Sequence, residues 1–353
     1  MSRECETLVF FGGGNLLLRC VERARARGYS ATVFAAPRHS GEIVAPFPGD
    51  SPGRFGDWLE SRGLPFHVVE DINGCDDFLS LGTRGATGIG FGETYTFSRE
   101  TVAVFQHRLF DMMVIRLPQY RGGAHFSWQI LRGSRLGAWN IQEIDERMIP
   151  GVRDEGSVVM TREYFIPPSA RIPVDFFEIA DREGEELFSD FLDRLRSKDA
   201  FFPRKIDNGY SVYFPRLYTS AHAWIDWSWT AEELERFVCA FDDPYPGAST
   251  FLHGKRVFFK NVSRDPTEGR FHPFMSGLVY RIDARGVFVA CRDEALVVRD
   301  VRDESGTHIS EMILPGSRFV TPRSFLDEAL SFEANYDARG LSQDVRHQGG
   351  SVS

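Results

Sequence analysis

Short apolar runs alternate with helix-like stretches in the first half of the chain. The run at residues 7–11 (TLVFF) precedes three glycines, and residues 16–27 then have helical spacing. Further strand-like runs follow at 32–35, 66–69 and 87–91, with a helix-like stretch at 57–62. This order predicts an α/β fold with a Rossmann-like, mostly parallel sheet and helices on both faces. Ligands of such sheets bind outside the carboxyl ends of the strands.

The second half of the chain has a different pattern. Residues 201–229 lose helical periodicity and gather glycine and proline, which is typical of a linker. Thr230 is a suitable N-cap for a helix that ends near residue 241. Short alternating runs then predict strands at 256–260, 276–282, 287–291 and 295–299. Several short strands within about 100 residues favour a small barrel of the oligonucleotide-binding type. We therefore expect a first domain over 1–200, a linker over 201–229, a barrel with its leading helix over 230–330, and a tail over 331–353.

The glycines at residues 12–14 do not complete a dinucleotide-binding fingerprint. That motif needs a third glycine where helix and strand pack closely, and Leu17 occupies this place. A glycine pair after a strand more often makes only a tight turn. We therefore do not expect a nicotinamide cofactor.

Composition narrows the classes of protein further. The chain has 353 residues, is 42% hydrophobic, and carries a net charge of -9. No apolar run approaches the length of a membrane span, and no signal-peptide pattern is present, so we expect a cytoplasmic protein with no membrane partner. The five cysteines are scattered, which predicts free thiols, and no histidine has a partner at metal-ligand spacing, which predicts no metal site. The negative balance disfavours a large nucleic-acid footprint.

Two stretches resemble the methionyl-tRNA formyltransferase family. The first is LPQYRGGA at residues 117–124, which is similar to the family's Leu-Pro-x-aromatic-Arg-Gly-x-Ala turn. The second runs from YFPRL at 213–217 through IDW at 225–227 to PYPGA at 244–248, and resembles the family's bridge into its C-terminal barrel. The resemblance implies a formyltransferase domain followed by a barrel, and transfer of a formyl group from 10-formyltetrahydrofolate to an amine.

The resemblance also shows where this chain departs from the family's catalytic pattern. In the family an Asn-x-His pair precedes the Leu-Pro turn, and here those positions hold Asp111 and Met113. The family's Asp-x-Gly motif is retained, with Asp154 as its aspartate. A thioether donates no proton, and loss of one oxyanion donor costs about 10²–10³ in rate. The family's usual mechanism is therefore in doubt at Met113.

Other residues near these motifs are candidates for the missing roles. His125 follows the Arg-Gly-Gly-Ala turn and can supply an imidazole, with Asp111 and Asp154 as a carboxylate pair. Each has a simpler interpretation: His125 as a helix-packing residue, and Asp111 as a strand-end carboxylate. The expected substrate-binding residues are Arg121, which can instead brace its turn, and Gly92 and Glu93 at the ligand edge.

The charge of the second half bears on the acceptor. Residues 204–330 hold 16 Lys plus Arg and 18 Asp plus Glu, a net charge of -2. A tRNA-binding barrel needs a basic face, so we expect a small amine, such as an amino sugar nucleotide or an amino acid derivative. Three alternatives remain open at this point: a different reaction on the same scaffold, a catalytically inactive binding protein, and a tRNA formyltransferase. The sequence does not fix the oligomeric state.

Overall fold

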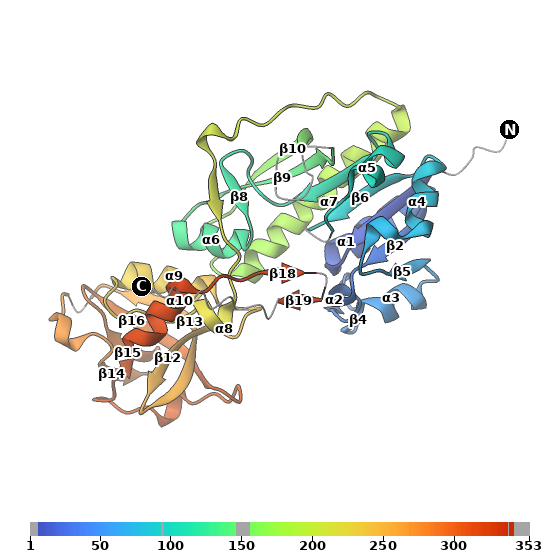
Figure 1. Cartoon of the computed structure of the whole chain (residues 1–353). Coiled ribbons are helices and arrows are strands. Elements are labelled where there is room, and N and C mark those ends of the chain that lie inside the picture. Colours follow the sequence, from blue (N-terminus) through green and yellow to red (C-terminus); the bar gives the residue numbers. More distant parts are fainter. Residues whose placement is uncertain (1–5, 93–94, 146–155, 268, 338, 342–353) are drawn as a thin grey trace, which may run out of the picture.

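The computed structural model describes residues 6–92, 95–145, 156–267, 269–337 and 339–341. Two sheets organise these residues (Figure 1). A seven-stranded sheet with its helices forms the N-terminal region, which we define as residues 6–197. A six-stranded antiparallel sheet forms the barrel region, residues 231–320. The predicted fold class, a Rossmann-like region followed by a small barrel, is confirmed.

The large sheet has the strand order β10-β9-β7-β6-β1-β2-β5. The five strands from β7 to β5 are parallel, whereas β9 and β10 are antiparallel to their neighbours. Apolar runs form the parallel strands because side chains on both faces are covered by helices. The strands are β1 (Thr7–Gly12), β2 (Ser30–Ala35), β5 (Phe66–Val68), β6 (Thr87–Phe91), β7 (Leu109–Met113), β9 (Leu136–Glu143) and β10 (Ser157–Phe165).

Helices cover both faces of this sheet. One face packs on α1 (Gly14–Ala26), α3 (Phe55–Ser61), α6 (His125–Arg132) and α7 (Pro173–Ser197). The other face packs on α4 (Asp76–Thr83) and α5 (Arg99–Phe105). Short elements fill the connections: α2 (Pro37–Ser40), β3 (Ile43–Val44), β4 (Gly53–Arg54) and the 3-10 turn η1 (Ile72–Gly74).

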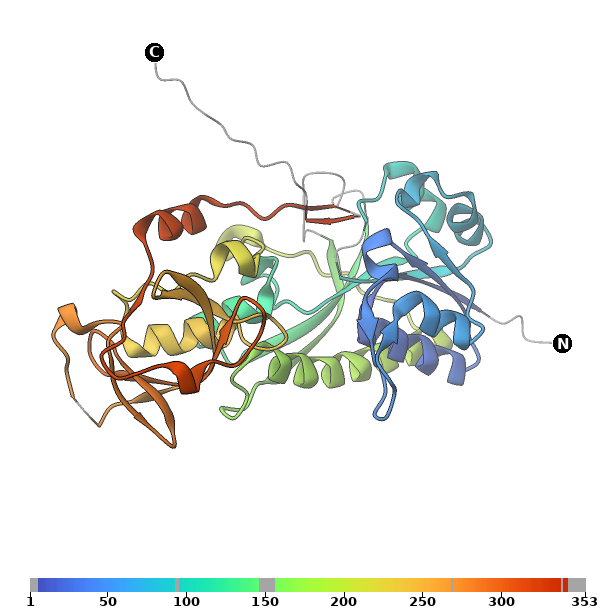
Figure 2. The same ribbon diagram turned by 90° about the horizontal axis from the view of Figure 1, so that it is seen from below.

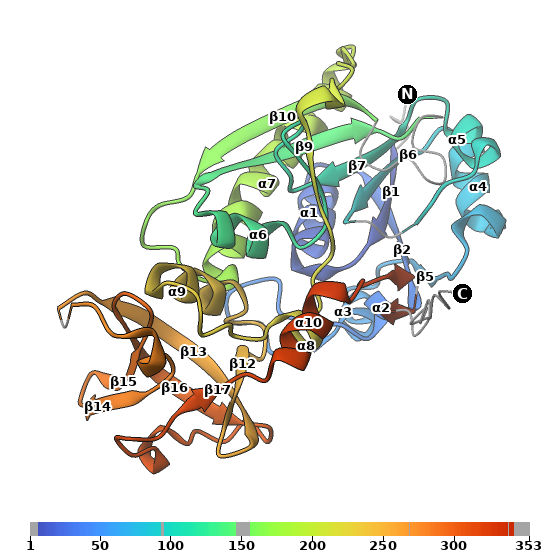
Figure 3. The same cartoon turned by 60° about the vertical axis from the view of Figure 1, so that its left-hand side comes forward.

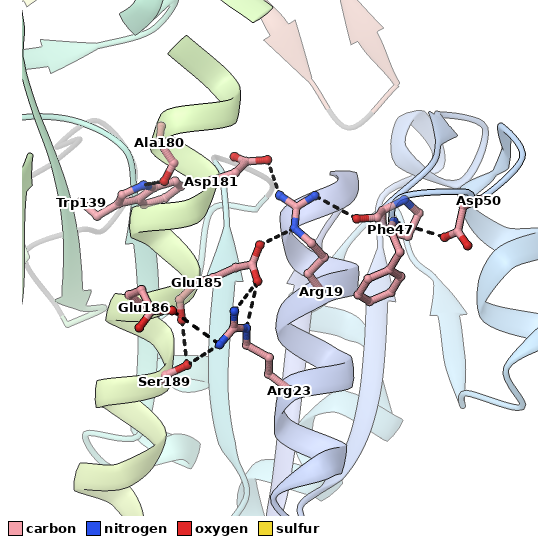
Figure 4. A network of polar contacts seen from close by, with 11 residues as sticks. Arg19, Arg23, Phe47, Asp50, Trp139, Ala180, Asp181, Glu185, Glu186 and Ser189 are labelled. Atoms are coloured by element: carbon pink, nitrogen blue, oxygen red, sulfur yellow. Dashed lines mark hydrogen bonds and ion pairs between the residues drawn. The ribbon is translucent and has the colours of Figure 1, made fainter. Parts of the chain in front are cut away.

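A polar network joins α1 to α7 (Figure 4). Arg19 pairs with Asp181 at 2.5 Å and with Glu185 at 2.6 Å. Arg23 pairs with the same Glu185 at 2.7 Å and donates a hydrogen bond to Ser189 at 3.0 Å. Burial raises the pKa of Asp181, while the Arg19 guanidinium acts in the opposite direction. The network fixes the long helix α7 against the first strand–helix unit.

The linker is attached to the N-terminal region by its backbone. β11 (Val212–Phe214) pairs in parallel with β8 (Tyr120–Gly122), which belongs to the Leu-Pro turn. Gly122 has φ +100°, and a Cβ there would lie 1.9 Å from the carbonyl oxygen of Phe214. Only glycine permits this approach. Two short helical turns, η3 (Asn208–Tyr210) and α8 (Thr219–His222), complete the connection.

The barrel region begins with α9 (Ala231–Ala240), which Thr230 and Glu233 cap reciprocally as the sequence predicts. Its sheet has the order β14-β15-β16-β13-β12-β17. Backbone hydrogen bonds between Gly277–Val279 and Gly316–Phe319 join the edge strands and close the barrel. Its strands are β12 (Ala248–Leu252), β13 (Lys255–Asp265), β14 (Val279–Asp283), β15 (Gly286–Ala290), β16 (Ala295–Asp303) and β17 (Phe319–Val320), with turns η4 (Pro273–Met275) and η5 (Ser310–Met312).

The chain continues beyond the barrel into elements that the sequence pattern does not predict. Helix α10 (Arg323–Ser331) lies on the barrel region, and strands β18 (Tyr336–Asp337) and β19 (Gly340–Leu341) lie beside the N-terminal region (Figure 3). These strands fall within the range expected as a tail from residue 331. Residues 342–353 of that range lie outside the described residues.

Candidate active site

The order of the parallel strands locates a candidate ligand site. The chain passes from β1 outward through β2 to β5, then returns to β6 on the other side of β1. The strand order therefore reverses between β1 and β6, and ligands of open α/β sheets bind at the carboxyl ends of such neighbouring strands. Gly12 and Phe91 end these two strands. The candidate ligand position therefore lies at the carboxyl ends of the strands, the edge at which the sequence pattern predicts a ligand.

Asp111 lies one strand away from this position, on β7. Its side chain is buried, and a carboxylate oxygen lies 2.9 Å from where a Cβ on Gly90 of β6 would stand. That Cβ would also contact Phe11, so Asp111 shares the α4–α5 face of the sheet with Phe11. The carboxylate is therefore held at low exposure close to the candidate ligand position, where a simple strand-end carboxylate would be solvated.

Met113 ends β7 on the same face as Asp111, since the two positions are separated by one residue. Its side chain is half-buried and packs on an apolar group that includes Ile115, Leu117 and Val158. A thioether suits these neighbours, whereas an imidazolium placed there would lose hydration. Leu117 precedes Pro118 through a cis peptide bond.

Two polar residues on β9 face this pair and were missed in the sequence. Asn140 is directly opposite Met113, and Gln142 is directly opposite Asp111, in the antiparallel β7–β9 ladder. Both are fully buried. Their signal was present in the sequence, because polar residues at alternate positions interrupt an otherwise apolar strand. The carboxyl end of β7 therefore adjoins a buried polar patch rather than an isolated aspartate.

The two amides differ in how their hydrogen-bonding groups are used. Asn140 donates to the carbonyl of Ile115 at 2.5 Å and accepts from Thr161 at 2.7 Å. Gln142 donates to the carbonyl of Gly156 at 3.0 Å, and within the described part of the chain its Oε1 has no hydrogen-bond partner. A buried carbonyl without a partner costs about 1–3 kcal/mol, so Gln142 is retained at some cost in stability.

His125 lies at the start of α6, on the other side of the sheet from Asp111. Its ring packs near Tyr120 and Phe126, with centroids 6.2 Å and 5.7 Å away, and Phe126 belongs to the packing group of α1 and α7. Burial lowers the pKa of His125 to about 4, so the imidazole is neutral near pH 7. Its Nε2 has no hydrogen-bond partner among the residues with described positions. The structure therefore does not place this ring in one packed group with Asp111.

The remaining predicted residues are placed as follows. Arg121 lies on β8, where its backbone pairs with Tyr213 of β11. Gly92 follows β6 with φ +71°, next to the candidate ligand position, and a Cβ there would meet open space. Glu93 and Asp154 lie outside the described residues.

Side chains of this protein, Glu42 and His39, lie against the N-terminus of α1. Glu42 accepts a hydrogen bond from the backbone of Gly14, and burial raises its pKa. A Cβ on Gly13 would lie 2.8 Å from His39 and 3.0 Å from Glu42. Burial lowers the pKa of His39 to about 4. A dinucleotide phosphate at this helix end would compete with the Glu42 carboxylate.

Three further features concern the cysteines, possible metal ligands and possible membrane-spanning helices. Cys20, Cys75, Cys239 and Cys291 are free thiols, in accord with the prediction, and Cys5 lies outside the described residues. Across the described ranges no group of three or more His, Cys, Asp or Glu is arranged to hold a metal ion. None of the described helices combines the length and the apolar character that crossing a membrane requires.

Similarity to known proteins covers both regions. Residues 218–312 match the family described as "Formyl transferase, C-terminal domain". The methionyl-tRNA formyltransferase of Nitrosomonas eutropha is 25% identical over 208 residues, which are 58% of this chain and 61% of the relative. That of Nitrosococcus oceani is 32% identical over 211 residues, 60% of this chain and 58% of the relative. The chain thus spans about three fifths of the length of these curated relatives.

A solved formyltransferase structure has a fold similar to that of this chain. The N-formyltransferase from Helicobacter canadensis, in a complex with folinic acid and dTDP-3-aminofucose, superimposes with a TM-score of 0.58 at 15% identity. The superposition covers 83% of this chain and 99% of that protein. At this identity the likeness concerns the fold alone. Together with the sequence matches, it supports the resemblance of this chain to the formyltransferase family, from whose catalytic pattern the chain diverges at Asp111 and Met113.

Proposed function

We propose that the protein transfers a formyl group from 10-formyltetrahydrofolate to the amine of a small biosynthetic metabolite, such as an amino sugar nucleotide or an amino acid derivative. One observation carries the proposal: the buried carboxylate of Asp111 lies two residues before the end of β7, the strand next to β6, where the strand order reverses. The N-formyltransferase from Helicobacter canadensis, which has this fold and was solved in a complex with folinic acid and dTDP-3-aminofucose, supports the substrate class.

The reaction needs a proton acceptor beside the amine. When bound, 10-formyltetrahydrofolate supplies the formyl carbon, which forms a C–N bond to the amine as its bond to the folate nitrogen breaks. The amine loses one proton, and the folate nitrogen gains one. Asp111 is suited to accept the amine proton, because it is a carboxylate held at low exposure beside the candidate ligand position. The residues present fit this half of the reaction.

The second requirement is a donor for the formyl oxygen as negative charge develops on it. Met113 cannot donate, and His125 is neutral and packs on the opposite side of the sheet. We propose that Asp154, by its resemblance to the family's Asp-x-Gly motif, acts with Asp111, and that Arg121 and the Gly92–Glu93 turn contribute to substrate binding. This division of roles predicts a slower enzyme than a member that retains the Asn-x-His pair.

A second candidate function is formylation of an aminoacyl-tRNA, since the curated relatives are methionyl-tRNA formyltransferases. The net charge of -2 over residues 204–330 argues against it. Binding of tRNA through phosphates weakens steeply with salt. A gel shift at two salt concentrations separates the two candidates: salt-sensitive binding in the nanomolar to micromolar range would favour tRNA.

The proposed function is tested with the full chain. We expect release of tetrahydrofolate when the protein is mixed with 10-formyltetrahydrofolate and amino sugar nucleotides or ornithine-like amines, and binding of tetrahydrofolate by calorimetry. Folate binding without turnover of any amine would favour a binding protein or a different reaction on this scaffold. Absence of both folate binding and turnover would reject the proposal.

A further inference from the structure

The segment that follows the barrel returns to the N-terminal region. After β17 the chain forms α10 on the barrel, and residues 332–337 and 339–341, here called the strap, then run to the N-terminal region and end in β18 and β19 (Figure 2). All three views show the strap bridging the two regions. The family match ends at residue 312, so the strap lies beyond it.

The end of the strap nearest the barrel is attached by aromatic packing. The ring of Phe325 on α10 lies 4.6 Å from that of Trp224 and 5.0 Å from that of Phe251. His222 Nε2 donates to the carbonyl of Phe332 at 3.1 Å, and the two rings lie 5.4 Å apart. Aromatic contacts of this kind bury large surfaces and hold their geometry. This end is therefore attached through half-buried rings, although none of the residues of α10 is fully buried.

The far end is attached by a charged pair. Arg339 Nε lies 3.0 Å from Glu70 Oε1, and its Nη2 donates to Oε2 at 3.1 Å. The Arg339 side chain is 75% exposed and that of Glu70 is 56% exposed. Exposed pairs of this kind shift an equilibrium by at most about fivefold and are screened by salt. Among the described contacts, rings and a hydrogen bond hold one end of the strap, and an exposed charged pair holds the other.

Glu70 stands on a well-ordered part of the carboxyl edge. It lies two residues after the end of β5, and the N–H of the intervening Val69 donates to the carbonyl of Ala35 at 2.9 Å. The hydroxyl of Tyr95 donates to the carbonyl of Val69 at 2.8 Å, which ties the segment after β6 to the same place. Four strand spacings separate β5 from β7, about 19 Å. The weak attachment therefore lies on the edge that carries Asp111.

We propose that the strap is a reversible closure of the carboxyl edge, fastened by the Arg339–Glu70 pair and hinged on the barrel. The inference rests on the proposed function in one respect, namely that folate and amine enter at this edge. Strands β18 and β19 contain two residues each, and a hairpin of this size is not stable alone in water. Their backbone pairing therefore reports whether the strap is docked.

Hydrogen exchange of the β18 and β19 amides tests the closure without any ligand. Arg339→Glu places a like charge beside Glu70, and we expect exchange about two- to fivefold faster. The double variant Glu70→Arg with Arg339→Glu restores the pair with reversed charges and should return exchange to the wild-type rate. Arg323→Glu is the matched control, because it makes the same charge change in an exposed pair with Asp327 within α10. Equal effects of Arg323→Glu and Arg339→Glu, or no restoration in the double variant, would overturn the closure.

Tetrahydrofolate release tests the link to the site. We expect Arg339→Glu to raise the dissociation rate of tetrahydrofolate in stopped-flow experiments by a factor similar to its effect on exchange, with Arg323→Glu unchanged. Unchanged release in a variant whose strap exchanges faster would show that the strap does not cover the folate. If tetrahydrofolate binds to none of the proteins, the proposed function fails, and the exchange experiment still decides the closure.

Discussion

The barrel interior and the carboxyl edge of the large sheet bury different kinds of side chain. In the barrel, Trp227 stacks on Phe319, both rings contact Phe259 edge-on, and all three are almost fully buried. Next to the candidate ligand position of the large sheet, the buried side chains of Asp111, Asn140 and Gln142 are polar, and burying polar groups costs free energy that hydrogen bonds must offset. Natural proteins depart from well-satisfied packing mainly at functional sites. The difference between the two regions therefore indicates where selection has acted on chemistry rather than on stability.

The largest effect is expected at Asp111. Asp111→Asn keeps the shape of the side chain and removes its capacity to accept a proton, so kcat for amine formylation should fall about 10²–10⁴-fold. Steady-state kinetics at saturating amine measure this change.

Asp57→Asn, at an exposed position on α3, is the control and should leave kcat unchanged. Equal rates for the Asp111 variant and the wild type, with both proteins folded by circular dichroism, would remove Asp111 from the mechanism.

The next largest effect is expected in the barrel. Phe259→Ala deletes a fully buried ring that packs 4.8 Å from Phe319, and should lower the free energy of unfolding by about 3–5 kcal/mol. Urea unfolding measures it. Phe274→Ala removes a ring that is 77% exposed and should cost far less. Similar losses in both variants would mean that the barrel interior does not carry the stability assigned to it.

The third effect concerns pH. An unfolded histidine titrates near pH 6.5, whereas the pKa of His125 in the fold is about 4. Between these values the unfolded chain binds a proton that the folded chain does not, so the free energy of unfolding falls as pH drops from 6.5 to 4. His125→Phe should reduce this loss by about 3 kcal/mol at pH 4.

Denaturant unfolding between pH 4 and 7 measures the slope. The control is His253→Asn, because His253 is exposed and has φ +49°, which asparagine tolerates. It should leave the slope unaltered. A wild-type slope in His125→Phe would show that the imidazole is hydrated in solution.

The smallest effect distinguishes the two amides of β9. Asn140→Leu leaves the Ile115 carbonyl and the Thr161 hydroxyl without their partner and should cost about 2 kcal/mol. Gln142→Leu breaks one hydrogen bond but also removes a buried carbonyl without a described partner, so its net cost should stay within about 1 kcal/mol. Urea midpoints rank the two variants, and a larger loss for Gln142→Leu would reverse our interpretation.

Much of the scaffold could be predicted because local pattern and burial agree. The TLVFF run is β1, and the alternating residues 295–299 lie within β16, whose inward positions are apolar. Asp111 and Met113 could be located by counting back from Pro118. Contacts between elements far apart in the sequence could not be predicted by counting. The sequence did not indicate that Asn140 and Gln142 lie opposite Met113 and Asp111, or that the helix beginning at His125 packs with α1 and α7. The strap was missed because its two-residue strands carry no periodicity and depend on docking for their pairing.

The pairing of β11 with β8 has a consequence for exchanging parts between members of the family. Residues 212–214 precede the barrel in the chain, yet their backbone completes the Leu-Pro turn of the other region, and Trp128 stacks on Phe214. A chimaera joined ahead of residue 212 would combine a native turn with a foreign strand. The junction for a functional graft belongs after residue 214, so that the connecting peptide stays with the turn it completes.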